Sequence, residues 1–103
     1  MQKKENHWKK YEQNAEMHGV MANPKRLAII NTLNVGEMSV DEIAKKLHIK
    51  PTNLSQHLTH LRRARVVKTR REGTRVFYRL VDAKIIKACD ILHDFNLKQY
   101  PSA

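Results

Sequence analysis

One stretch of the sequence, from Ile49 to Ala64, constrains the fold more than any other. Leu54, Leu58 and Leu61 recur at the spacing of a single helical face, and Pro51 suits a first helical position, where its missing N–H has no partner to lose. The opposite face is polar and has no carboxylate; it carries Thr52, Asn53, Gln56, Thr59, His60 and Arg63. A merely solvated face normally includes Glu and Asp, whereas amides, hydroxyls and Arg suit base edges beside phosphates. The stretch therefore predicts a recognition helix for nucleic acid.

The charge distribution supports the same interpretation. The 103 residues carry a net charge of +10, from 20 Lys and Arg against 10 Asp and Glu. Much of the excess lies in one segment, opposed only by Glu72, and comprises Arg62, Arg63, Arg65, Lys68, Arg70, Arg71, Arg75 and Arg79. Such a basic cluster beside a polar helix is the electrostatic footprint expected for nucleic acid, although a simply soluble basic surface is the alternative. A membrane surface is disfavoured, because no basic amphipathic helix has a large apolar face.

Three helices are predicted before this stretch, over residues 7–20, 23–34 and 39–48. Asn23 followed by Pro24 is typical of a capped helix start, and Ser39 with Glu42 forms a capping-box pattern. The helix over 39–48 and the Pro51 helix are joined by a tight turn, which predicts a helix-turn-helix. In that arrangement the first helix braces the second, whose outer face meets the major groove.

The hydrophobic period changes after Ala64. Residues 66–71 and 75–81 read as strands around a turn at 72–74, which predicts a β-hairpin, or wing, with Arg70, Arg71 and Arg75 near its tip. Asp82 can cap a last helix that runs to about Lys98. The predicted fold is mainly α with a small β-hairpin, a winged helix-turn-helix of order α-α-α-α-β-β-α. One domain is expected over residues 1–103, with 1–6 and 99–103 as frayed tails.

The first and last helices carry more apolar surface than so small a domain can bury. Trp8, Tyr11 and Ala15 lie near one stripe of the first helix, which needs its own domain or a second copy to pack against. The last helix is apolar around most of its circumference, through Ile85, Ala88, Cys89, Leu92 and Phe95. Part of that helix is therefore expected to meet a partner helix.

Taken in this order, the chain resembles the ArsR/SmtB family of dimeric winged-helix repressors. The resemblance covers about residues 15–95 and rests on Met21–Leu27, Leu54–Arg62, Val67–Gly73 and Val76–Leu80. It implies a homodimer through the first and last helices, an imperfect palindromic DNA operator, and repression relieved by an inducer. It also implies base contacts by Thr52, Asn53, Ser55, Gln56 and His57. The helical wheel ranks Gln56, Thr52 and Asn53 first.

Both metal sites familiar in that family are missing from this sequence. The segment Met38–Glu42 has no cysteine where arsenic and cadmium sensors carry thiolates, and Asp82-Ala83-Lys84 lacks the first histidine of the zinc and nickel site. The branch without metal sites, which includes regulators of virulence, nodulation and redox response, is the nearer likeness. We therefore expect no cofactor, and the inducer stays unidentified.

Cys89 is the only cysteine, so an intramolecular disulfide is impossible. Cys89 and His93 are one helical turn apart and, with their symmetry mates, would supply a two-Cys, two-His metal site. An intersubunit disulfide is a second alternative. A small buried cysteine beside a boundary histidine is the favoured interpretation, because free cysteine is among the most buried residue types.

The full set of predicted DNA-binding residues is Thr52, Asn53, Ser55, Gln56, His57, Thr59, His60, Arg62, Arg63, Lys68, Arg70, Arg71 and Arg75. The predicted dimer interface comprises Trp8, Tyr11, Ala15, Ile85, Cys89 and Leu92. An enzyme is not expected, since the sequence has no phosphate-binding glycine loop and no defensible catalytic triad. Without a signal peptide or an apolar run long enough for a membrane, we expect a cytoplasmic protein. The alternatives are a sequence-neutral, chromatin-like DNA-binding protein and a winged-helix module that binds RNA or protein.

Overall fold

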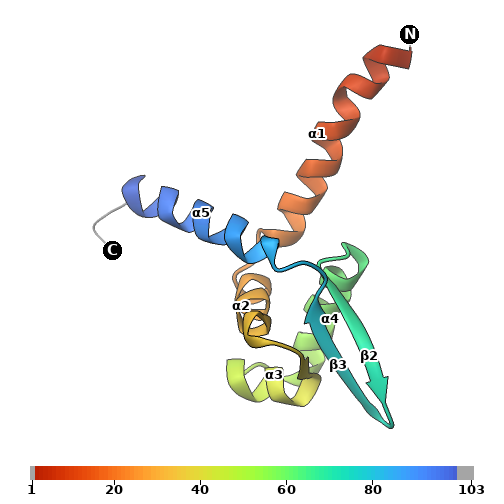
Figure 1. The fold of residues 1–103 in the computed structure, drawn as a ribbon, viewed down its shortest axis with the longest axis vertical. Helices are drawn as coiled ribbons and strands as arrows, with labels where there is room; N and C mark the ends of the chain where they lie inside the picture. The colour runs from red at the N-terminus through yellow and green to blue at the C-terminus, as the bar shows by residue number, and fades with distance from the viewer. Residues whose placement is uncertain (1, 100–103) are drawn as a thin grey trace.

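The computed structural model describes residues 2–99, and it has the winged helix-turn-helix architecture that the sequence predicts (Figure 1). The elements in chain order are α1 (Gln2–Met21), α2 (Pro24–Thr32), the 3-10 helix η1 (Leu33–Val35), β1 (Met38–Ser39), α3 (Val40–Leu47), α4 (Pro51–Arg63), β2 (Val67–Glu72), β3 (Arg75–Leu80) and α5 (Lys84–Gln99). The predicted hairpin and five helices are confirmed, whereas β1 and η1 were not foreseen.

The helix starts follow from their capping residues. The Asn23 side chain accepts hydrogen bonds from the backbone N–H groups of Lys25 and Arg26, at 3.0 and 3.2 Å. The predicted capping box is present at the N-terminus of α3, with both of its hydrogen bonds formed. Ser39 Oγ accepts from Glu42 N at 3.2 Å, and Glu42 Oε1 accepts from Ser39 N at 2.9 Å. These contacts satisfy amides that have no partner within the helix. The chain then leaves α3 through His48, whose φ of 54° is in the left-handed region.

The core lies where α2, α3 and α4 meet the root of the hairpin. The predicted leucine stripe of α4 is buried in it, with Leu54, Leu58 and Leu61 at most 1% exposed. Around the stripe pack Ile29, Ile30, Leu33, Ile43, Ala44, Val66 and Val67. Burial of the stripe fixes which side of α4 faces outward, because residues on the opposite side of a helix cannot reach the same core.

The sheet is antiparallel, with strand order β1-β3-β2. Strands β2 and β3 pair from Val67 with Leu80 to Glu72 with Arg75, so Gly73 and Thr74 form a two-residue turn. Gly73 has φ of 62°, a conformation that glycine adopts without steric cost. The short β1 pairs Met38 with Tyr78 and Ser39 with Phe77, and thereby joins the start of α3 to the wing.

Helices α1 and α5 extend away from the body formed by α2 to α4 and the hairpin (Figure 1). The radius of gyration is 16.0 Å, whereas a compact domain of this length has about 13 Å. Trp8, Tyr11, Leu92 and Phe95 are each more than half exposed on these two helices. The two extended helices therefore present apolar surface that this chain alone leaves open to solvent.

The ends of the chain correct one prediction. Helix α1 begins at Gln2 rather than at His7, so the segment predicted as a frayed N-terminal tail is helical from its second residue. Helix α5 continues to Gln99, and residues 100–103 of the predicted C-terminal tail lie outside the described residues. Among the helices described, none is both long enough and apolar enough to cross a membrane.

Candidate DNA-binding interface

The outer face of α4 presents the polar side chains that the helical wheel placed there. Thr52, Asn53, Gln56, Thr59, His60 and Arg63 are all exposed, and Ser55 and Arg62 flank them. Arg62 and Arg63 occupy the last turn, where cations also interact favourably with the helix dipole. No carboxylate lies on this helix. The face can therefore approach polyanionic DNA without a repulsive charge of its own.

Two hydroxyl groups on this face already make hydrogen bonds within the helix. Ser55 Oγ donates to the carbonyl oxygen of Pro51 at 2.9 Å, and Thr59 Oγ1 donates to that of Ser55 at 2.8 Å. Both hydroxyls can still accept a hydrogen bond, but their protons are committed to the helix backbone. Within residues 2–99, no protein group bonds the side-chain amides of Asn53 or Gln56. These two amides are the groups best able to make bidentate contacts with a base.

His57 differs from the prediction. It is half-buried, and its Nδ1 accepts a hydrogen bond from Arg26 Nε at 3.3 Å. Burial lowers the pKa of His57 below its usual value, and the charges of Arg26, Lys25 and His60 lower it further. The imidazole thus belongs to the contact between α4 and α2 rather than to the outer face. The sequence showed only that His57 stands at the edge of that face.

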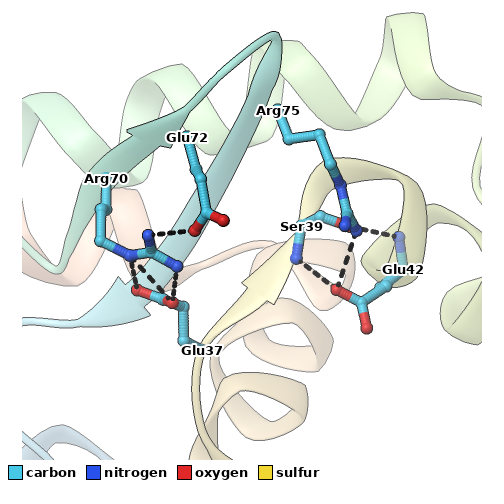
Figure 2. Close-up of polar contacts among 6 residues, drawn as sticks. All are labelled: Glu37, Ser39, Glu42, Arg70, Glu72 and Arg75. Atoms are coloured by element: carbon cyan, nitrogen blue, oxygen red, sulfur yellow. Dashed lines mark hydrogen bonds and ion pairs between the residues drawn. The ribbon is translucent and has the colours of Figure 1, made fainter.

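Two of the three wing arginines are engaged by carboxylates (Figure 2). Arg70 lies 2.7 Å from Glu37 Oε1 and 2.7 Å from Glu72 Oε2, while Arg75 lies 3.8 Å from Glu42 Oε1. Both guanidinium groups also stack over the Phe77 ring, at 4.7 and 4.8 Å from its centroid. Arg70 is thus paired with two carboxylates within the protein, and Arg75 lies within ion-pair distance of one. Contact of either residue with DNA stays a prediction.

The strand register explains which arginine stays available. Side chains alternate along β2, so Lys68, Arg70 and Glu72 share one face, and Val67, Thr69 and Arg71 share the other. Val67 on this second face is buried in the core. Arg71 is exposed near the tip, and no carboxylate of the described residues pairs with it. Among the three wing arginines, Arg71 is therefore the one whose charge no carboxylate of the described residues compensates.

The contacts at the wing shift the pKa values of the carboxylates that take part in them. The hydrogen bond from Arg70 lowers the pKa of Glu37, and the hydrogen bonds from Ser39 lower that of Glu42. The same contacts with Glu37 and Glu72 raise the pKa of Arg70. Sequence reasoning missed Glu37 and Phe77 as partners of the wing arginines. The only signal for them was the strand alternation, which placed Phe77 beside Arg75 and Arg79.

A groove of about 930 Å³ lies between α1, α2 and α5. Its apolar lining includes Met17, Met21, Leu27, Ile85, Cys89 and Leu92. Three of the predicted dimer residues, Ile85, Cys89 and Leu92, thus share one face, as the sequence indicated. Trp8 and Tyr11 lie further along α1, where their rings pack 6.0 Å apart between centroids, and Ala15 is exposed on the same helix.

The groove also contains the candidate metal and redox residues, Cys89 and His93. His18 and Asp90 line it too, but in the described part of the chain these side chains do not form a metal-ligating cluster of three. Burial raises the pKa of the Cys89 thiol, and the nearby Asp90 charge acts in the same direction. A raised pKa disfavours the reactive thiolate. The thiol is half-buried rather than fully buried, so the groove leaves it reachable in a single chain.

Comparison of the sequence with known proteins identifies the family of this chain. The sequence profile described as "Bacterial regulatory protein, arsR family" matches residues 23–69. A biofilm growth-associated repressor of Agrobacterium fabrum is 44% identical over 71% of this chain and 62% of its own length. The transcriptional activator HlyU of Vibrio cholerae is 41% identical over 71% of this chain and 68% of its own length. The chain thus spans about two thirds of these relatives.

A solved structure gives the same result for the fold. The homodimeric winged helix-turn-helix DNA-binding domain Mb0332 of Mycobacterium bovis superimposes with a TM-score of 0.77 at 32% identity. The match covers 86% of this chain and 85% of that one. With the profile, the relatives and the fold in agreement, this chain belongs to the ArsR family of bacterial regulatory proteins.

Proposed function

We propose that this protein is a homodimeric transcriptional repressor that recognises a palindromic DNA operator and is released by an inducer. The observation that carries the proposal is the outer face of α4, where the amides of Asn53 and Gln56 are exposed on a helix that carries no carboxylate. Amide groups make bidentate hydrogen bonds with adenine in the major groove. Thr52, Ser55, Thr59 and His60 supply further contacts along the same face.

Backbone contacts come from the basic residues around α4 and the wing. We assign Arg62, Arg63, Lys68 and Arg71 to phosphate or minor-groove contacts, since all four are exposed. Arg70 and Arg75 have a different part in this proposal. The ion pair of Arg70 with Glu37 ties the wing to the segment before β1, and that of Arg75 with Glu42 ties it to α3.

The dimer forms through α1 and α5. The groove between these helices and the exposed side chains of Trp8, Tyr11 and Leu92 give each copy a self-complementary apolar surface. The homodimeric Mycobacterium bovis domain supports this assembly by likeness. A two-fold axis would bring the two copies of α4 to successive major grooves, about 34–36 Å apart.

Repression is the direction we favour, although relatives are named both as repressor and as activator. A dimer that lies across two successive grooves occupies promoter DNA that a polymerase must reach. We place the protein in the cytoplasm, together with the chromosome. The inducer would act on the dimer rather than on the DNA-reading face, because the dimer sets the spacing of the two helices.

The test is selection of binding duplexes from a randomised DNA library, followed by titration of the selected duplex against a scrambled one at fixed salt. A repressor should prefer the selected duplex by at least about 10³-fold. Gln56→Ala should cost about 1–3 kcal/mol on the selected duplex and relax the preference at one base position. Asn34→Ala removes a comparable exposed amide outside α4 and should change nothing.

Three results would contradict the proposal, in whole or at one residue. Equal affinity for the selected and scrambled duplexes would identify a sequence-neutral, chromatin-like DNA-binding protein. An unchanged preference in Gln56→Ala would remove this residue from base recognition. Failure of the wild-type protein to bind any duplex at low salt would point instead to a winged-helix module for RNA or protein.

A further inference from the structure

Arg26 connects three helices through its single guanidinium group. Its Nε donates to His57 Nδ1 in the middle of α4 at 3.3 Å, and its Nη1 donates to the carbonyl oxygen of Val20 in the last turn of α1 at 3.1 Å. Its own backbone N–H is held by the Asn23 cap at 3.2 Å, which fixes the first turn of α2. The sequence marked Arg26 only as part of a motif. The structure makes it the polar link between the extended helix α1 and the recognition helix α4.

The contact with Val20 pairs a cationic donor with a helix C-terminal carbonyl group that lacks a partner within the helix. The last carbonyl groups of a helix have no partner within the helix, and a cation near them is stabilised by the helix dipole. Arg26 supplies both a donor and a positive charge at this end of α1. Its guanidinium is therefore fixed on one side before it meets His57.

The contact with His57 requires a particular protonation state. Nδ1 can accept from Arg26 only with its lone pair free, so the imidazole is neutral and carries its proton on Nε2. The charged groups that act on the ring are Arg26 and Lys25 from α2 and His60 from its own helix, all of them basic. A protonated ring would aim an N–H at a guanidinium among these charges, and the contact would open.

We propose that Arg26 and His57 act as positioning residues that set the angle of α4 against α1, and that protonation of His57 releases this clamp. The inference rests on the proposed function, since the clamp matters through operator binding. If α1 joins the two copies, its angle to α4 decides whether both recognition helices reach successive grooves. Release of the clamp should therefore weaken the palindromic duplex far more than a scrambled one.

The key variant is His57→Asn, because the amide oxygen can accept from Arg26 but does not titrate. His57→Leu removes the acceptor altogether. On the duplex selected from the library at about pH 8, His57→Asn should bind within about threefold of wild type, and His57→Leu at least about tenfold more weakly. Circular dichroism melting then confirms that each variant is folded.

The pH dependence separates the clamp from a simple packing role. Between about pH 8 and about pH 5, wild type should lose affinity relative to His57→Asn, and the loss should come below about pH 6.5 because the pKa of His57 is lowered. Effects of pH that do not involve His57 act on both proteins and cancel in their affinity ratio. A ratio that stays constant over this range would overturn the proposal, as would wild-type affinity in His57→Leu.

Two further measurements make the result decisive. Arg26→Gln and His57→Leu remove the same contact, so the double variant should bind no worse than the weaker single variant; independent, additive losses would contradict the clamp. The second measurement tests the protonation state: the ¹⁵N spectrum of the free protein at neutral pH should show His57 as the Nε2–H tautomer. The Nδ1–H tautomer would refute the clamp alone. A wild-type protein that binds no duplex would refute the proposed function, and with it the role of the clamp in DNA binding.

Discussion

Arg70 on β2 and Glu37 on the segment before β1 form an ion pair across the sheet, with 2.7 Å between Nη2 and Oε1 (Figure 2). The two residues are 33 positions apart in the sequence, so the pair is a tertiary contact. Glu72 holds the same guanidinium from the strand itself, and Phe77 lies beneath it. Among the wing arginines, Arg70 thus has the most contacts within the protein, and these contacts stabilise the fold. Its neighbour Arg71 stays open to a ligand.

Adjacent arginines should therefore behave differently towards DNA. Arg71→Ala should weaken binding to all sequences and reduce the slope of log affinity against log salt by about 1, if it contacts one phosphate. Arg70→Ala removes the same charge from the next position, where Glu37 and Glu72 already compensate it, and should change the slope less. Affinity titrations over a salt series measure both. Equal slope changes would show that the ion pairs do not survive in the complex.

The two carboxylates beside the wing predict an acid dependence of stability. The pKa of Glu37 and of Glu42 is lowered in the folded protein, so each stabilises the fold above its ordinary pKa. That stabilisation should disappear as the pH falls through the lowered values. Glu42→Gln keeps an acceptor for the Ser39 amide but cannot ionise. Its melting temperature should fall less steeply below about pH 4.5 than that of wild type, and parallel curves would contradict this origin.

The dimer should depend on the apolar face of α5. Leu92 lines the groove and is 62% exposed in the single chain, so Leu92→Glu places a charge where the partner is expected. Sedimentation should show a monomer, and binding to the palindromic duplex should drop towards that of a half-site. Lys87→Glu introduces the same carboxylate on the polar strip of α5, outside the groove, and should stay dimeric. A dimeric Leu92→Glu variant would place the interface elsewhere.

The leucine stripe should dominate the stability of the reading helix. Leu58 is 1% exposed, and Leu58→Ala should cost about 2–5 kcal/mol because it leaves a cavity between α4 and its neighbours. Val35 is 82% exposed, so Val35→Ala should change the free energy of unfolding by less than about 0.5 kcal/mol. Urea unfolding at one protomer concentration measures both, since dimerisation makes stability concentration-dependent. A small loss in Leu58→Ala would mean that the core closes around the gap.

The local features of this protein were determined by the sequence alone. The spacing of Leu54, Leu58 and Leu61 predicted both the helix and its buried side, because helical geometry leaves one outcome for that pattern. Asn23 and Ser39 marked two helix starts, since capping is a contact between near neighbours in the chain. The predicted turn at 72–74 likewise contains Gly73, which takes the left-handed conformation in the hairpin.

Only the tertiary structure decided which polar residues remain available for a ligand. Charge patterning treated Arg70, Arg71 and Arg75 alike, but the register of β2 and β3 sends Arg70 and Arg75 towards Phe77 and Arg71 to the opposite face. The helical wheel left His57 at the edge of the reading face, and Arg26, which precedes it by 31 residues, draws it inward. Such contacts depend on the distance between elements in space, which periodicity along the chain does not contain. The sequence therefore defined the reading helix, and packing decided which of its charged neighbours hold it in place and which are free to meet DNA.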